Sequence, residues 1–187
     1  MNKLTERLVL GAGALVIGLI VGWAVRGVAT YGTTTETVTT YQDWRTACPP
    51  SALKDQKCQM IEDVLDKQTQ QPVVRVALSS ENGTQELGLT LPFGVALEPG
   101  LGLVLGTDKP ILMRYRTCNQ VGCISVLPLD DKLLAAMASS KDGRILVEGL
   151  DAKPVAIPIS FKGYGDAMHA YRSAEAKRSS WFWRLWS

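Results

Sequence analysis

The amino-acid sequence predicts an all-β fold. We expect an antiparallel β-sandwich with one short helix, preceded by a single N-terminal transmembrane helix and followed by a C-terminal helix with a Trp-rich tail. Three observations predict this: residues 8–25 carry no charge, turn residues interrupt 41–161 about every 8–12 positions, and all four cysteines follow the uncharged stretch. The expected parts are a membrane anchor (1–30), a Thr-rich linker (31–40), a periplasmic β-sandwich (41–165) and a C-terminal helix with an aromatic, basic tail (166–187).

The uncharged stretch 8–25 is long enough to cross a membrane as a helix. At roughly 1.5 Å per residue it would measure on the order of 27 Å, close to the hydrocarbon thickness of about 30 Å. Lys3 and Arg7 precede it and favour a cytoplasmic N-terminus. A cleaved signal peptide ending at residues 27–29 is the alternative, but its apolar core usually has only about 7–15 residues. We favour an uncleaved anchor, and both interpretations export the rest of the chain.

Small residues recur every four positions within this stretch, at Ala14, Gly18 and Gly22. In a helix they share one face, which lets the backbone of another helix approach closely. This face predicts either self-association or contact with a partner subunit in the membrane.

The exported part carries no excess of basic charge. Of 20 basic and 18 acidic side chains, Lys3, Arg7, Arg26 and Glu6 precede residue 31, so 17 of each sign remain. Nucleic-acid binding requires a basic surface, so we exclude that class of function.

About nine candidate strands follow the linker, and apolar residues alternate in several of them. Leu87, Leu89 and Leu91 fall on one face of such a strand. Pro128 and Pro158 lie inside apolar runs and predict edge or bulged strands. The clearest strand segments are 73–78, 86–91, 101–105, 111–117, 123–127, 145–147 and 155–161.

Two helices are expected in this part of the chain. Asp130 is a suitable N-cap for a short helix that runs to residue 138. A second helical stretch over 166–177 contains His169, which is the single histidine.

The four cysteines suit an oxidising compartment and are expected to form disulfides. They fall into two close pairs, Cys48 with Cys58 and Cys118 with Cys123, and turn residues lie between the members of each pair. Four cysteines allow three pairings, among which we favour the two local ones. Neither spacing matches a redox Cys-x-x-Cys motif or a zinc site.

No catalytic set, cofactor site or metal site is predicted. The chain has one histidine, His169, which is too few for a metal site built on histidine ligands, and no nucleophile motif accompanies it for a catalytic triad. Adjacent carboxylates occur at Glu62 and Asp63 and at Asp130 and Asp131. A hydrolase that uses an unrecognised carboxylate site therefore stays open as an alternative.

The C-terminal heptapeptide has the most unusual composition in the chain, with three of the five tryptophans. Aromatic rings beside cations are enriched at membrane interfaces. We therefore predict that this segment contacts the outer face of the same bilayer that holds the anchor, or a membrane partner, through Trp181, Phe182, Trp183, Arg184 and Trp186.

Three segments together resemble the invasion-associated locus B family: Tyr41-x-x-Trp44 before Cys48, the turn 116–123, and the segment 155–164. The resemblance covers roughly residues 41–172. It implies an exported proteobacterial β-sandwich, associated with host-cell invasion in some pathogens, with no catalytic residues to carry over. This chain departs from the family pattern in its long anchor and its Trp-rich end.

These observations predict a non-enzymatic, membrane-anchored periplasmic interaction module. We expect it in the bacterial inner membrane with a single span, as an accessory or scaffold subunit of a protein complex or as a homo-oligomer formed through the transmembrane helix. The main alternative is an exported virulence or adhesion factor that acts in host-cell invasion.

Overall fold

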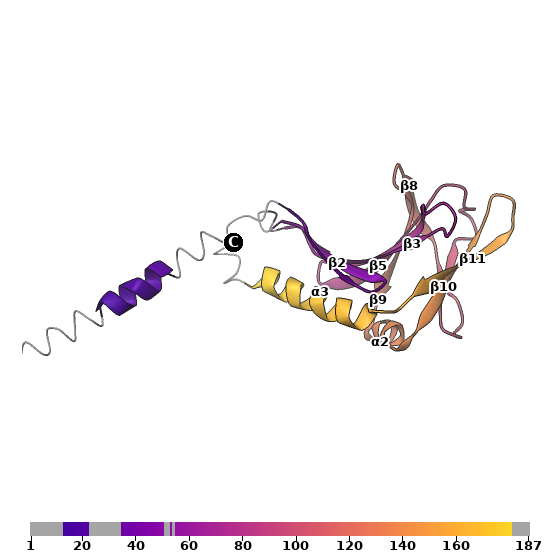
Figure 1. The fold of residues 1–187 in the computed structure, drawn as a ribbon. Helices are drawn as coiled ribbons and strands as arrows, with labels where there is room; N and C mark the ends of the chain where they lie inside the picture. Colours follow the sequence, from indigo (N-terminus) through magenta and orange to yellow (C-terminus); the bar gives the residue numbers. More distant parts are fainter. Residues whose placement is uncertain (1–12, 23–34, 51–52, 54, 181–187) are drawn as a thin grey trace, which may run out of the picture.

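Two antiparallel sheets and two helices make up the folded part of the chain (Figure 1). The computed structural model describes residues 13–22, 35–50, 53 and 55–180. Residues 13–22 are helical, and in the described part of the chain no helix is both long enough and apolar enough to span a membrane. The remainder of the predicted span 8–25 lies outside the described residues.

The larger sheet has seven strands in the order β1-β2-β3-β4-β5-β9-β8. Each neighbouring pair is antiparallel, and the first five strands follow one another in sequence. Their bounds are β1 Thr37–Tyr41, β2 Trp44–Cys48, β3 Gln59–Leu65, β4 Pro72–Glu81, β5 Thr84–Leu91, β8 Tyr115–Asn119 and β9 Gly122–Leu129.

The smaller sheet has four strands in the order β11-β10-β6-β7. Its free edges are therefore β11 and β7, and β11 contains Pro158, as the edge-strand prediction requires. Its bounds are β6 Leu101–Leu105, β7 Ile111–Met113, β10 Asp142–Glu148 and β11 Pro154–Ser160.

The described chain has eleven strands, two more than the sequence predicts. The predicted strand 111–117 is divided at Arg114 into β7 and β8, which belong to different sheets. The predicted linker 31–40 is wrong over its last four residues, because Thr37–Tyr41 forms β1 and pairs with β2. Threonine is β-branched and favours strands, so a Thr-rich segment is suited to this exposed edge.

The core lies between the two sheets and under the second helix. Leu87, Leu89 and Leu91 on β5 are buried, as their alternation predicts. Leu101, Leu103 and Leu105 on β6 belong to the same core cluster, together with residues from β10. The all-β prediction is confirmed in this respect.

The first helix of the domain, α2 (Asp131–Ser139), begins where the sequence predicts. The Asp130 carboxylate accepts a hydrogen bond from the backbone N–H of Leu133 at 2.8 Å and so caps the helix.

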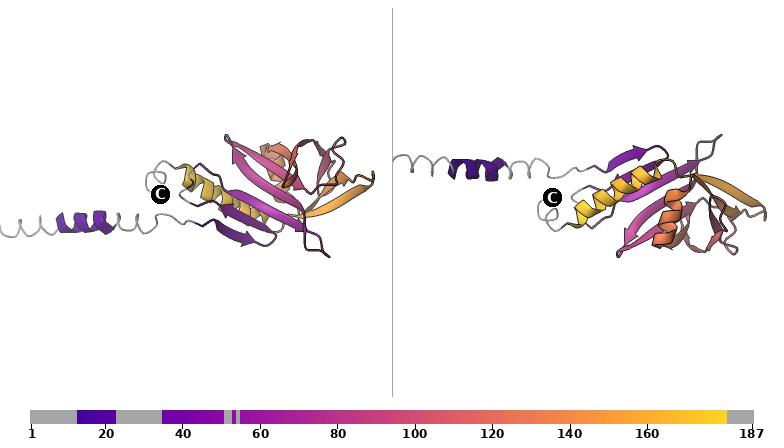
Figure 2. Two further views of the ribbon diagram at one scale, coloured as in Figure 1. Left: turned by 90° about the horizontal axis from the view of Figure 1, so that it is seen from above. Right: turned by 90° about the horizontal axis from the view of Figure 1, so that it is seen from below.

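The second helix, α3 (Tyr164–Ser179), packs along β1, β2 and β3 (Figure 2). Tyr164, Ala167, Met168 and Tyr171 are buried and form one face of the helix. The predicted boundary at residue 165 is therefore wrong, because this helix completes the core instead of following the domain.

Candidate functional site

The junction between β11 and α3 is fixed to the β1–β2 hairpin by a buried indole. Trp44 is fully buried, and its Nε1–H donates a hydrogen bond to the carbonyl oxygen of Ser160 at 2.8 Å. Its ring stacks on Phe161 with centroids 6.2 Å apart and meets Tyr164 edge-on at 5.3 Å. Three aromatic rings thus hold the start of α3 against the sheet.

Gly163 allows the chain to turn between β11 and α3. Its φ is +80°, and a Cβ at this position would overlap the carbonyl oxygen of Tyr41. Only glycine therefore fits this close approach of two backbone segments. A hydrogen bond from the Ser160 hydroxyl to the Asp43 carboxylate, at 2.6 Å, also joins the two segments.

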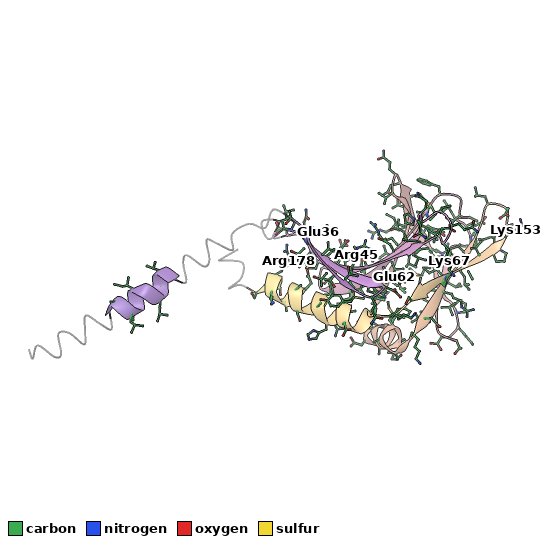
Figure 3. The ribbon with its side chains drawn as sticks, viewed as in Figure 1. Glu36, Arg45, Glu62, Lys67, Lys153 and Arg178 are labelled. Atoms are coloured by element: carbon green, nitrogen blue, oxygen red, sulfur yellow. A yellow bond between two sulfur atoms is a disulfide. The ribbon has the colours of Figure 1, made fainter. Side chains whose placement is uncertain are left out.

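Glu62 on β3 faces the same junction from the interior (Figure 3). Its Oε1 accepts a hydrogen bond from the backbone N–H of Ser160 at 2.8 Å, whereas Oε2 is buried and has no described hydrogen-bond partner. Burial raises the pKa of Glu62 from 4.5 to about 7; the hydrogen bond from Ser160 opposes this shift, and the charges of Asp43 and Asp63 add to it.

Asp63 lies on the opposite face of the sheet, because consecutive strand residues alternate. There it pairs with Arg45 and with Arg75, whose Nε is 2.7 Å from the carboxylate. Burial works to raise the pKa of Asp63, but the hydrogen bonds from Arg75 and Arg45 outweigh it and hold that pKa below its ordinary value. Glu62 and Asp63 therefore do not converge on one substrate position.

The other candidate catalytic residues have separate structural places. Asp130 caps α2, and Asp131 lines a small cavity between α2 and α3 with Met168 and Arg172. His169 is exposed on α3. Among the described residues, no group of three or more His, Cys, Asp or Glu side chains is arranged to hold a metal ion.

Both local cysteine pairs are disulfide-bonded in the structure, which is the pairing that the sequence favours. The bond between Cys118 and Cys123 joins directly opposed residues near the tip of the β8–β9 hairpin. The bond between Cys48 and Cys58 closes the loop between β2 and β3.

The end of α3 holds this β2–β3 loop in place. Glu175 accepts a hydrogen bond from the backbone N–H of Cys58 at 2.7 Å. The Arg178 guanidinium donates to three loop carbonyl oxygens, those of Pro49 at 3.1 Å, Leu53 at 2.7 Å and Gln56 at 3.0 Å. The planar fork of arginine suits this multiple contact.

An apolar cleft opens between the two sheets at the opposite end of β3. Its volume is about 440 Å³, within the range of small-molecule pockets. Charged residues in its lining are Asp66 and Lys67, from the β3–β4 turn. The apolar lining comes from β3, β4, the end of β5 with the segment after it, β10 and β11: Val64, Leu65, Val73, Leu91, Pro92, Phe93, Val95, Val147, Val155, Ala156, Ile157 and Pro158.

Residues 44–172 match the family model described as "Invasion associated locus B (IalB) protein". The chain belongs to the IalB family. Proteins named "Invasion protein B homolog" from Brucella abortus strain 2308 and Brucella abortus biovar 1 strain 9-941 are each 32% identical to it over 131 residues. Those matches cover 69% of this chain and 75% of each relative.

A crystal structure of invasion associated protein B from Bartonella henselae has a similar fold. The TM-score is 0.66 at 22% sequence identity, with 75% of this chain and 99% of the other covered. The family model and the two Brucella relatives confirm the resemblance to the IalB family that the sequence motifs indicate.

The structure explains all three motifs by which the IalB resemblance is recognised. Trp44 and the segment 155–164 meet at the junction described above, through the hydrogen bond to Ser160 and the close approach at Gly163. The turn 116–123 contains the disulfide of the β8–β9 hairpin. These motifs therefore serve to hold the IalB fold together.

Two features of this IalB protein were not predicted from its sequence. Glu175 and Arg178 are three residues apart on α3 and so share a side of the helix, but nothing local indicates that the β2–β3 loop lies there. The apolar cleft is lined by five separate segments of the chain. Pro158 predicts that β11 is an edge strand, but no local pattern indicates that this edge borders a cleft.

The remaining predicted contact residues are only partly described. Ala14, Gly18 and Gly22 lie in the helix 13–22 and are exposed, and nothing lies within 4 Å of a Cβ placed at Gly18 or Gly22. The predicted contact residues Trp181, Phe182, Trp183, Arg184 and Trp186 lie outside the described residues.

Proposed function

We propose that this IalB family protein is a non-enzymatic, membrane-anchored interaction module of the bacterial periplasm. In this proposal it serves as an accessory or scaffold subunit of an inner-membrane protein complex, with a cytoplasmic N-terminus. The observation that supports it best is that the chain enters and leaves the folded domain at the same end.

A continuous set of contacts connects the start of β1 to the end of α3. Thr37, the first residue of β1, pairs with Cys48, which is disulfide-bonded to Cys58. Cys58 is hydrogen-bonded to Glu175, and Arg178 one turn later contacts the same loop. Both ends of the domain therefore face the same direction, as Figure 1 shows for β1 and α3.

This arrangement supports attachment at two points. The predicted anchor 1–30 precedes β1 by a few residues, and the aromatic, basic segment 181–187 directly follows α3. Both segments would therefore meet the same bilayer surface, with the tryptophan rings at the headgroup level. The Cys48–Cys58 loop and the end of α3 would stand closest to the membrane.

The exposed small residues in the helix 13–22 provide the proposed contact with a partner. Gly18 is open enough for a second helix to approach at its Cα. Gly13 lies on the opposite side of the same helix and is equally open, which makes it a matched control position.

Co-purification from native membranes in a mild detergent tests this function. We expect the full chain to stay in the membrane after alkaline carbonate washing and to co-purify with another subunit or a second copy. Gly18→Leu should reduce that association, whereas Gly13→Leu should retain it. Recovery of a lone monomer, or release of the chain by carbonate, would contradict the proposal.

The second candidate function is an exported factor that acts in host-cell invasion. It is favoured by the names of the two Brucella relatives and of the Bartonella protein. Mass spectrometry of the mature N-terminus separates the two functions. A chain that starts at Thr30 would favour release, and a chain that keeps its N-terminal segment would favour anchoring.

A further inference from the structure

We propose that the apolar cleft between the two sheets binds the hydrocarbon chain of a free long-chain fatty acid, with its carboxylate at Lys67. The inference goes beyond the proposed function. It takes from that function only the orientation of the domain relative to the bilayer.

The cleft presents apolar side chains of both sheets to solvent. Leu65, Phe93 and Val155 line it and remain 46%, 64% and 47% exposed. Apolar surface of this kind in a concave site is stabilised when a hydrocarbon covers it. The lining and the volume of about 440 Å³ therefore suit a flexible aliphatic chain.

The edge of β11 that borders the cleft is poorly suited to binding a peptide as an added strand. The backbone N–H of Ser160 points away from β10, because it donates to Glu62. The next N–H, of Phe161, points to the β10 side and donates to the carbonyl oxygen of Lys141, the residue before β10. Main-chain N–H directions alternate along a strand, so the backbone nitrogens of residues 154, 156 and 158 also point away from β10, toward the free edge.

Two of these three outward positions are prolines and carry no N–H. Pro154 and Pro158 leave Ala156 as the one donor in this part of the free edge. Strand addition depends on a row of main-chain hydrogen bonds, so β11 blocks it. A ligand that binds by apolar contact alone is not affected by this loss.

Lys67 gives the cleft a cation at its rim. Its ammonium makes no ion pair with another described residue. The neighbouring Asp66 carboxylate is directed into its own turn, where Oδ1 accepts from the N–H groups of Gln68 at 2.9 Å and Thr69 at 2.7 Å. Asp66 keeps its negative charge but is held within its turn, so the Lys67 ammonium is the group at the rim that can pair with an anionic head group.

The position of the cleft favours a free fatty acid over a bilayer lipid. β3 begins at Gln59, beside the disulfide end of the domain, and ends at Leu65, in the cleft. At about 3.3 Å per residue, roughly 20 Å separates the cleft from the end that faces the membrane in our proposal. A lipid that stays in the bilayer would not reach it.

Photo-crosslinking tests the inference on the full chain in phosphatidylcholine nanodiscs. The probe is hexadecanoate that carries a diazirine in its chain, and labelled peptides are mapped by mass spectrometry. We expect label on the segments that contain Leu65, Phe93 and Val155. Excess unlabelled hexadecanoate should remove this label, whereas hexadecanol, which lacks the charge, should compete less well.

Two pairs of variants locate the site. Val155→Asp places a charge in the cleft and should reduce labelling about tenfold, whereas Leu112→Asp, at a more exposed apolar position on β7 outside the cleft, should not. Lys67→Glu should reduce labelling up to about fivefold, and Lys109→Glu in another exposed turn should leave it unchanged. Circular dichroism of each variant verifies that it folds.

Three results would overturn the inference. The first is crosslinked label that is confined to the N-terminal segment. The second is label in the cleft that neither Val155→Asp nor Lys67→Glu reduces. The third is that photoreactive phosphatidylcholine labels the cleft and the fatty acid does not. Recovery of a partner protein crosslinked at Val155, with no fatty-acid label there, would identify a protein ligand instead. Cleft labelling in a chain that carbonate releases from membranes would contradict only the proposed function.

Discussion

The indole Nε1 of Trp44 lies 2.8 Å from the carbonyl oxygen of Ser160, and this hydrogen bond joins residues 116 positions apart in the sequence. It connects β2 to the end of β11 and places Phe161 and Tyr164 against the same ring. The start of α3 therefore depends on a contact with the beginning of the domain.

Trp44→Phe tests this hydrogen bond. The variant keeps an aromatic ring but leaves a Ser160 carbonyl without its donor, and we expect a loss of about 1–3 kcal/mol in the free energy of unfolding. Urea denaturation measures it. Tyr115→Phe is the control, because its buried hydroxyl has no described hydrogen-bond partner and its removal should change stability little. Equal effects of the two substitutions would contradict the role of the hydrogen bond.

Gly163→Ala tests the close approach at the start of α3. A positive φ costs a non-glycine residue about 1–3 kcal/mol, and overlap with the Tyr41 carbonyl adds to this cost. We expect the variant to unfold at a much lower temperature or to fail to fold.

Gly165→Ala is the matched control for that substitution. Gly165 lies within α3, and nothing lies within 4 Å of the position that a Cβ would occupy there, so alanine should stabilise the helix by about 0.5–1 kcal/mol. A thermal melt that is unchanged by Gly163→Ala would show that the backbone relaxes at the junction.

The ionisation of Glu62 should make stability depend on pH. Its pKa is about 7 in the folded protein against 4.5 for an ordinary glutamate, so the folded state binds more protons between these values. Stability should therefore fall as pH rises from about 5 to about 8, by about 2–3 kcal/mol at most. Urea denaturation across this pH range measures the change.

Glu62→Gln separates this effect from other titrations. The amide oxygen can still accept the Ser160 N–H, and the side chain stays neutral. The variant should be more stable than the natural protein at pH 8 and should show a flatter pH profile. Parallel profiles for the two proteins would exclude Glu62 as the cause.

The two disulfides should contribute unequally to stability. Chain entropy assigns about 2–3 kcal/mol to each loop, with the larger value for Cys48–Cys58, which closes a separation of 10 residues against 5 for Cys118–Cys123. Double alanine variants of each pair, compared by urea denaturation, test this order. The first variant should also loosen the loop held by Arg178, which hydrogen exchange at the loop amides would detect.

Local patterns in the sequence were sufficient for several elements. The alternation of Leu87, Leu89 and Leu91 identifies β5 and its buried face, and Asp130 identifies the start of α2. Each of these signals depends on residues a few positions apart. The same signals placed the domain boundary at residue 165, because they show that α3 is a helix but not what it packs against.

The candidate site depends on contacts that no local pattern contains. Glu62 and Asp63 are adjacent in sequence, yet one faces the buried junction at Ser160 and the other pairs with Arg75 on the opposite face. The cleft likewise requires β3 and β11 to lie close together.

By itself the sequence determined the all-β class and favoured the local cysteine pairs, since both follow from residue spacing along the chain, and its motifs carried the resemblance to the IalB family. The tertiary structure decided that α3 belongs to the core, that the carboxylates separate, that both ends of the domain lie together and that an apolar cleft opens at the other end. The physical reason is that periodicity assigns a face to each element, whereas the pairing of faces is selected by burial and hydrogen bonding among residues as distant as Trp44 and Ser160.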